Sequence, residues 1–344
     1  MNRKALTELR EDIYKREHFT YLNISVLNPS NNTVLVEAKY ENNLTIPIMP
    51  DPAAYVAAIV SFTTPASSLP IFQFHNNAYR ITLSYLSSNY SQYLTFVSYA
   101  ASDMVNQFVY YIQQFVDSIN NTFTALYNLL IADYPGVVNA APYIVYQFGQ
   151  FALICDGLNY DVNAVNPVEI FFNQKLFNFF LPMQAYAFGL NLPSFKDNQI
   201  LVKDNGAGST TGSLSGTTYT ITTEYDPVAL WSFVKSIVII SSTTGIKNHV
   251  MVTNAFVSGQ QNVNIYQPII ASLDVSINEM NRTSYINYEP KFLVYSDMTT
   301  KDPLSNISFR LGFITKDLNV FPLYLFPSQC SSILVQFKHK TILS

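Results

Sequence analysis

The 344-residue sequence has few charged residues and only two cysteines. Charged side chains make up 12% of it, against roughly 25% in an average soluble domain. Two cysteines are too few for a disulfide framework, and a chain of this length buries enough surface to fold without one. Aromatic side chains reach 15%, and interface cores are rich in aromatics and poor in charge. The composition favours a surface covered by other subunits. A genome biased toward A and T, which would give an Asn-rich chain, explains it equally well.

Nucleic-acid and membrane binding lack their usual signals. The net charge is −4 and no basic stripe occurs, so general binding to phosphates is not expected. No run of eighteen apolar residues could cross a membrane. The first eighteen residues also lack the apolar core of a signal peptide. We therefore expect a soluble protein that is made without a signal peptide.

Catalytic motifs are missing as well. The four histidines lie far apart, and no His-Glu-x-x-His, Cys-x-x-Cys or Gly-x-Ser-x-Gly motif occurs. Asp297 and Asp302 flank a Thr-rich turn, but turn aspartates usually bond their own backbone. We predict that the protein is not an enzyme and needs neither a cofactor nor a metal ion.

Alternating apolar and polar residues predict short strands near both ends of the chain. In the last segment Ile333, Val335 and Phe337 fall on one face, while Lys338 and Lys340 fall on the other. The same alternation recurs in residues 34–40, 79–85 and 309–314. We predict a mainly β fold in which residues 19–95 and 191–344 form a β-sandwich.

Residues 96–190 interrupt this β pattern. From Ser102 to Ala132 apolar residues recur every three or four positions, which predicts a helix, and the run at Asn120 favours a break in it. Residues 141–157 then predict two strands, and residues 166–186 a strand followed by a helix. We interpret the region as a mixed α/β lobe inserted into the sandwich.

Residues 205–218 hold four glycines and one bulky apolar residue, Leu214. This composition predicts a flexible surface loop. A phosphate-binding loop is the alternative, but the Gly-Lys-Ser/Thr that would follow it is absent.

The first 18 residues carry a large share of the charge around an apolar line of Leu6, Leu9 and Ile13. This helical spacing predicts a short N-terminal arm with too little apolar surface to fold alone. The arm is either frayed in the free subunit or docked on a partner. The candidate assembly contacts are the cations of the arm and of the last strand: Arg3, Lys4, Arg10, Arg16, Lys338 and Lys340.

Several segments resemble the minor capsid, or penton, proteins of virophages and Polinton-like viruses. In the C-terminal half these are SIVIISSTTGI, PIIASLDVSI and the run from YEPKFLVYSDM to the ending Phe337–Lys340. AAYVAAIVSFTTPASSLPIF and IFFNQKLFNFF are similar to other parts of that family. One turn departs from its acidic, glycine-containing pattern and reads Asp317, Leu318, Asn319 and Val320 here.

The resemblance implies a single jelly roll that assembles as a homopentamer at the fivefold vertices of an icosahedral virion. It implies a place in the capsid beside the major capsid protein of surrounding capsomers, after synthesis in the host cell. A host receptor or a vertex spike is a further expected partner, while no specific nucleic acid is expected. Two alternatives stay open: a receptor- or carbohydrate-binding spike or lectin with Trp231 and Tyr platforms, and, ranked lower, a glycosidase with paired carboxylates.

Overall fold

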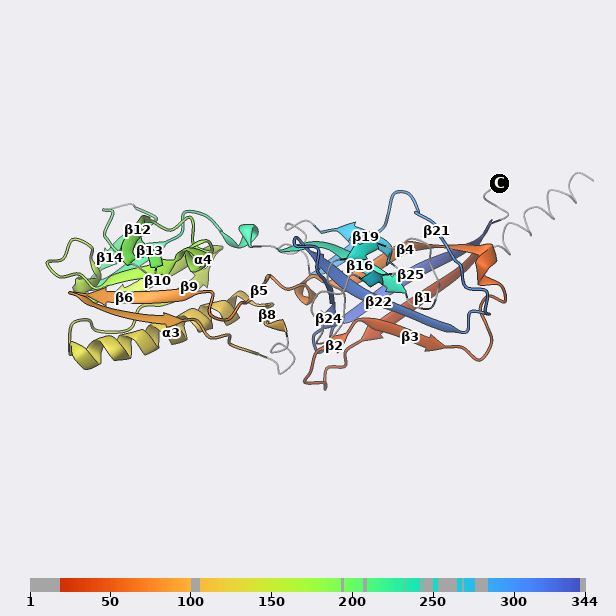
Figure 1. The fold of residues 1–344 in the computed structure, drawn as a ribbon, viewed down its shortest axis with the longest axis horizontal. Coiled ribbons are helices and arrows are strands. Elements are labelled where there is room, and N and C mark those ends of the chain that lie inside the picture. Colours follow the sequence, from red (N-terminus) through yellow and green to blue (C-terminus); the bar gives the residue numbers. More distant parts are fainter. Residues whose placement is uncertain are drawn as a thin grey trace, which may run out of the picture. The chain divides into compact units, whose positions relative to one another are not determined.

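The computed structural model describes residues 19–99, 106–192, 195–206, 209–231, 233–241, 243, 250–252, 265–267, 269–275 and 284–340. The predicted arm, with its candidate contacts Arg3, Lys4, Arg10 and Arg16, lies outside them. The chain divides into two compact units, drawn in Figure 1. We call Met1–Leu69 with Phe233–Ser344 the terminal unit, and Pro70–Ser232 the inserted unit.

The terminal unit contains a five-stranded antiparallel sheet in the order β1-β25-β4-β20, with β21 also paired to β4. Its central strand β4 is buried at four consecutive positions, Val56 to Ile59, so both of its faces are covered there. The strands are β1 (Phe19–Leu27), β4 (Tyr55–Pro65), β20 (Tyr285–Tyr288), β21 (Ser296–Asp297) and β25 (Cys330–His339).

A second sheet completes the sandwich in the order β19-β16-β22-β23, with β3 paired to β22. The Tyr40 hydroxyl of this sheet donates to Ser331 of the first at 2.7 Å, in the buried space between them. The strands are β3 (Lys39–Asn43), β16 (Val234–Ser241), β19 (Ile269–Asp274), β22 (Asn306–Thr315) and β23 (Val320–Pro322). Short elements add β2 (Val36–Glu37) paired with β24 (Tyr324–Leu325), β17 (Val250–Val252) paired with β18 (Ile265–Gln267), and the 3-10 turns η1 (Pro52–Ala54) and η2 (Ala66–Ser68).

The inserted unit combines a sheet in the order β12-β13-β11-β6-β7 with a second in the order β14-β15-β10-β9. The long helix α3 packs against β6, β7 and β9, and Figure 1 shows it running along the strands. The first sheet consists of β6 (Arg80–Tyr85), β7 (Ser88–Tyr93), β11 (Glu169–Asn173), β12 (Ala185–Leu192) and β13 (Phe195–Ile200). The remaining elements are β5 (Phe72–Gln73), β8 (Phe108–Val109), α3 (Ile112–Asp133), β9 (Tyr143–Gln147), β10 (Gln150–Asp156), η3 (Leu158–Tyr160), α4 (Gln174–Phe177), β14 (Gly212–Ser215), β15 (Thr218–Thr222) and η4 (Val228–Leu230).

The inserted unit is longer than the lobe predicted over residues 96–190. It begins at Pro70 and ends at Ser232. The reason is strand pairing: β6, expected in the sandwich, pairs with β7 and β11, and β13 also pairs with β11. Alternation in a sequence identifies a strand, but the sheet it joins depends on residues far away in the chain.

The predicted helix of residues 102–132 also differs in its bounds. Ser102 lies outside the described residues, β8 precedes the helix, and α3 begins at Ile112. The Gln114 side chain accepts the Tyr110 and Tyr111 N–H groups at 2.9 and 3.1 Å, which caps this start. No break occurs at Asn120, because its side chain exchanges hydrogen bonds with the backbone of Ile144.

Other predicted elements have mixed outcomes. The two strands expected in residues 141–157 are β9 and β10, and the strand and helix expected in residues 166–186 are β11 and α4. The glycine-rich stretch 205–218 is not a loop throughout, because Gly212–Ser215 forms β14 and pairs with β15. Residues 289–295 lie between β20 and β21 and belong to no strand.

Candidate functional site: an assembly surface

Of the two described candidate contacts, Lys338 lies in the closing strand β25 and Lys340 directly follows that strand. The predicted alternation of β25 is confirmed: Ile333, Val335 and Phe337 are at most 1% exposed, and the lysines lie on the other face with half-buried side chains. Burial of these apolar side chains fixes which face of the strand the lysines occupy.

Lys338 lies between two aromatic rings. Its Nζ is 5.7 Å from the ring centre of Phe19 and 5.6 Å from that of Tyr295. Phe19 stands directly opposite Lys338 in the β1–β25 pairing. A cation over an aromatic face contributes about 0.5–1 kcal/mol at a partly exposed site. The two contacts therefore favour this position of the lysine head over a fully solvated one.

A line of hydrogen bonds runs beside this lysine. The Tyr295 hydroxyl donates to Gln336 Oε1 at 2.6 Å, and Gln336 Nε2 donates to the Tyr21 hydroxyl. Burial, and the neighbouring Tyr21, raise the pKa of Tyr295. Tyr21 is nevertheless 58% exposed. We call Phe19, Tyr21, Tyr295, Gln336 and Lys338 the closing-strand patch.

Lys340 has its described partners inside the subunit. Its Nζ donates to the carbonyl of Ala53 at 2.7 Å and lies 3.3 Å from Asp297 Oδ1. These contacts tie the end of β25 to η1 and β21. Because both charged groups are more than a third exposed, the ion pair contributes at most about 1 kcal/mol.

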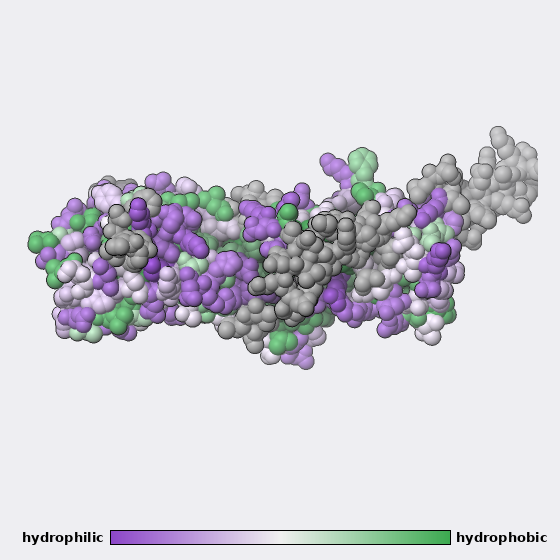
Figure 2. Space-filling view, viewed as in Figure 1, coloured by the Kyte–Doolittle hydropathy of each residue, from purple (hydrophilic) through white to green (hydrophobic). Residues whose placement is uncertain are grey.

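Apolar residues beside the patch were not identified from sequence as a contact surface. Phe292 is 85% exposed and Val294 is 71% exposed, both in the segment that leads to Tyr295. This segment projects from the strands in Figure 1, and Figure 2 shows hydrophobic residues standing out at the same place. Large exposed apolar groups that stand together usually mark an interaction site. An alternating apolar run predicts a buried strand and an exposed loop equally well, so the sequence held no signal that separates them.

Comparison with known proteins identifies the family to which this chain belongs. The family model described as Sputnik minor capsid protein V18/19 matches residues 20–339. The chain belongs to this family. A chain of the Sputnik virophage solved by cryo-EM is similar, with 18% identity, a TM-score of 0.68, and coverage of 95% of this chain and 99% of that chain. The mavirus penton protein, solved by crystallography, has 12% identity, a TM-score of 0.60, and coverage of 93% and 99%. A comparison with curated protein sequences gives no match.

The chain is thus a minor capsid protein with a mainly β, jelly-roll fold, which confirms the resemblance seen in the sequence. Its family indicates a structural role in the capsid and a place in the virion. In the described part of this minor capsid protein, no group of three or more His, Cys, Asp or Glu side chains could hold a metal ion. No helix in that same part is long and apolar enough to cross a membrane.

Proposed function

We propose that this minor capsid protein forms homopentamers at the fivefold vertices of an icosahedral virion. The observation that carries the proposal is the closing-strand patch with the exposed apolar loop beside it, on a jelly-roll unit. The similarity to a penton protein supports the same proposal at the level of the fold. Family membership favours it over a free-standing lectin or a glycosidase.

A five-membered ring needs two different surfaces on each subunit, because each copy contacts one neighbour on each side. The patch offers one such surface, with aromatic rings on both sides of the Lys338 ammonium group. Phe292 and Val294 offer apolar anchors of the kind that dominate interface energies. Among the described strands β1 pairs only with β25, so its other edge is open to a neighbour.

The arm and the inserted unit take other contacts in this proposal. The arm, with Arg3, Lys4, Arg10 and Arg16, docks on neighbouring subunits or faces the capsid interior. Phe19, the first described residue after the arm, lies opposite Lys338 of the patch. The major capsid protein of surrounding capsomers is the second partner, and the inserted unit serves the exposed or capsomer-facing side.

Sedimentation velocity of the purified chain tests the ring. We expect a species five times the 38.8 kDa mass of one chain, and a strict monomer at high concentration would contradict the pentamer. Val294→Ser should weaken assembly at least tenfold while the fold persists, because this side chain is exposed. Val165→Ser is the matched control, since Val165 is 97% exposed in the inserted unit. Equal effects of the two variants would remove the loop from the interface.

Deletion of residues 1–18 tests the arm. The arm is expected to add contacts between subunits but not to the sandwich core. The shortened chain should therefore keep its circular dichroism spectrum and form few vertices in a capsid-assembly assay. Normal vertices without these residues would show that the arm has no role in assembly.

A further inference from the structure

The inserted unit contains a pocket of about 350 Å³ that the assembly proposal does not use. Three segments far apart in the chain form it: the turn before β6, the end of α4 with the residues after it, and the end of η4. The lining residues are His75, Ala78, Tyr79, Lys175, Asn178, Phe179, Leu230 and Trp231. The volume lies at the lower end of the roughly 300–1,000 Å³ typical of ligand sites.

The floor and the rim of this pocket differ in chemistry. Tyr79 and Trp231 are 6% and 7% exposed and belong to a cluster of aromatic rings, so they form a fixed apolar floor. The indole N–H of Trp231 donates to the carbonyl of Phe179 at 3.2 Å, which orients the indole ring. His75, Lys175 and Asn178 are exposed at the rim. None of the described residues that line the pocket carries a carboxylate, although the chain as a whole is acidic.

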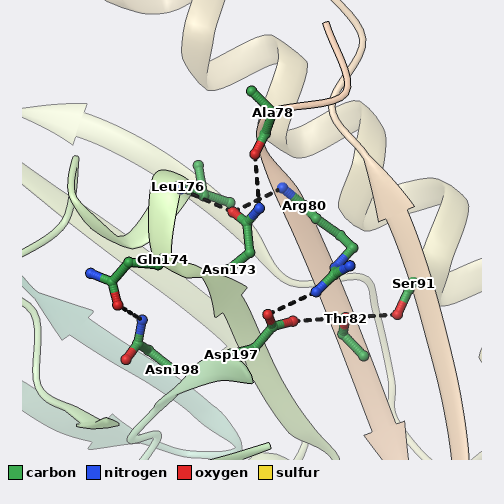
Figure 3. Close-up of polar contacts among 9 residues, drawn as sticks. All are labelled: Ala78, Arg80, Thr82, Ser91, Asn173, Gln174, Leu176, Asp197 and Asn198. Carbon is green, nitrogen blue, oxygen red and sulfur yellow. Dashed lines mark hydrogen bonds and ion pairs between the residues drawn. The ribbon is translucent and has the colours of Figure 1, made fainter. Parts of the chain in front are cut away.

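A polar network holds two walls of the pocket together, as Figure 3 shows. Asn173 Oδ1 accepts the N–H of Leu176 at 3.0 Å and thereby caps α4, and it also accepts the N–H of Arg80 at 3.2 Å. Its Nδ2 donates to the carbonyl of Ala78 at 2.8 Å. One side chain therefore joins the turn before β6 to the helix that carries Lys175. A pre-organised binding site requires hydrogen bonds of this kind, which fix the positions of the residues that line it.

The side chains of Asn178 and Lys175 at the rim can still donate hydrogen bonds to a ligand. Gln174 receives a hydrogen bond from Asn198 at 3.2 Å and donates to Asn178 Oδ1 at 2.8 Å. The oxygen of Asn178 is thus engaged, and its NH₂ group is the part that can donate to a ligand. Lys175 forms no ion pair with any residue that the structure describes.

We infer that this pocket binds a carboxylate-bearing monosaccharide, such as a sialic or uronic acid at the end of a glycan. The aromatic floor takes the apolar face of the sugar ring, as aromatic side chains do in ligand sites. Lys175 pairs with the carboxylate. Asn178 and His75 bond the hydroxyl groups. This activity would give the minor capsid protein an attachment function, and it does not depend on the pentamer.

Saturation-transfer NMR and calorimetry on the full chain test the inference, with the methyl glycosides of sialic acid, glucuronic acid and galactose. We expect at least one acidic glycoside to bind at least tenfold more tightly than the neutral galactoside. Lys175→Gln should abolish this preference. Lys203→Gln, a lysine of the same unit that does not line the pocket, should leave it unchanged.

Four results would overturn the inference. They are no binding of either acidic glycoside, equal binding of the neutral one, equal losses in the two lysine variants, and tighter binding of inorganic phosphate than of the sugars. The last result would point to a general anion site. Because Lys175 is exposed, its substitution should leave the fold intact, and an unchanged circular dichroism spectrum checks this.

Discussion

The two units handle buried polar groups in different ways. In the terminal unit the buried side-chain hydrogen bonds of the described residues join neutral groups, for example the Tyr40 hydroxyl to Ser331, and the Lys340–Asp297 pair lies at the surface. In the inserted unit a charged pair is inside: Arg80 lies 2.8 Å from Asp197, whose side chain is fully buried. The pair spans β11, because β6 and β13 lie on either side of that strand.

This difference matches the roles proposed for the units. A buried ion pair adds little net stability, but it allows one arrangement of the groups around it. Arg80 also donates its backbone N–H to Asn173, which holds the pocket walls. The inserted unit is thus built to keep a polar site in shape. The terminal unit presents aromatic and apolar groups that neighbouring copies can cover.

The largest expected effect comes from removing one partner of the buried pair. Asp197→Ala should lower the free energy of unfolding by roughly 3 kcal/mol or more, because the nearly buried Arg80 loses the carboxylate that it pairs with. Urea denaturation measures the loss, and hydrogen exchange should locate it in residues 70–232. Asp297→Ala, which breaks the exposed pair of the terminal unit, should cost less than about 1 kcal/mol. Similar losses in both variants would erase the contrast between the units.

The neutral contact should matter less. Tyr40→Phe removes the hydroxyl that bonds Ser331 and should cost about 1 kcal/mol, located in the terminal unit. Urea denaturation again gives the value. Tyr146→Phe, which removes a more exposed hydroxyl bonded to Asp226 at 3.2 Å, is the control and should cost less. A loss for Tyr40→Phe as large as that for Asp197→Ala would show that neutral and charged contacts do not differ here.

Each unit also has a hairpin turn with a large apolar residue in the left-handed region. Phe148 has φ of 53° and is fully exposed, and Leu318 has φ of 64° and is 47% exposed. That conformation disfavours side chains by roughly 1–2 kcal/mol, and asparagine tolerates it better. Phe148→Asn and Leu318→Asn should each raise the melting temperature. Phe292→Asn, which lies away from such a turn, should not raise the melting temperature. A rise in that variant would show that the gain comes from removing an exposed apolar side chain and not from the backbone conformation.

The smallest effect concerns pH. Burial raises the pKa of Glu169, and the hydrogen bond from Gln199 at 3.0 Å opposes only part of the rise. The folded protein therefore binds the proton more tightly than the unfolded chain. The resulting stabilisation is complete below about 4.3, the pKa of glutamate in the unfolded chain. It is lost as the pH rises through the raised pKa of Glu169 in the folded protein.

Glu169→Gln removes this titration. The melting temperature of the variant should exceed that of the natural chain by more at pH 7.5 than at pH 4.5. Burial acts on Asp197 in the same direction, since it raises that pKa despite the opposing Arg80. If the difference in melting temperature between the variant and the natural chain stays constant with pH, Glu169 does not contribute to the pH dependence of stability.

The sequence predicted the local elements better than their partners. Ile333, Val335 and Phe337 identified both the closing strand and its buried face, because alternation is a local signal. β6 was predicted as a strand, but its pairing with β11 depends on residues almost ninety positions later. The arm was predicted from its charge and spacing, and its structure lies outside the described residues.

The candidate sites were predicted only in part. Lys338 and Lys340 were chosen from the face they occupy, yet the rings around Lys338 come from distant segments at Phe19 and Tyr295. The pocket was missed because its three segments lie about a hundred and fifty residues apart from first to last. Trp231 was noted as a possible platform for a ligand, but only the fold brings it beside Lys175.

Electron microscopy of the purified, assembled protein tests whether the subunits form a fivefold ring. We expect ring-shaped particles whose class averages have fivefold symmetry, with the terminal units forming the ring. Particles with another symmetry, or only single subunits at concentrations that favour assembly, would contradict this expectation.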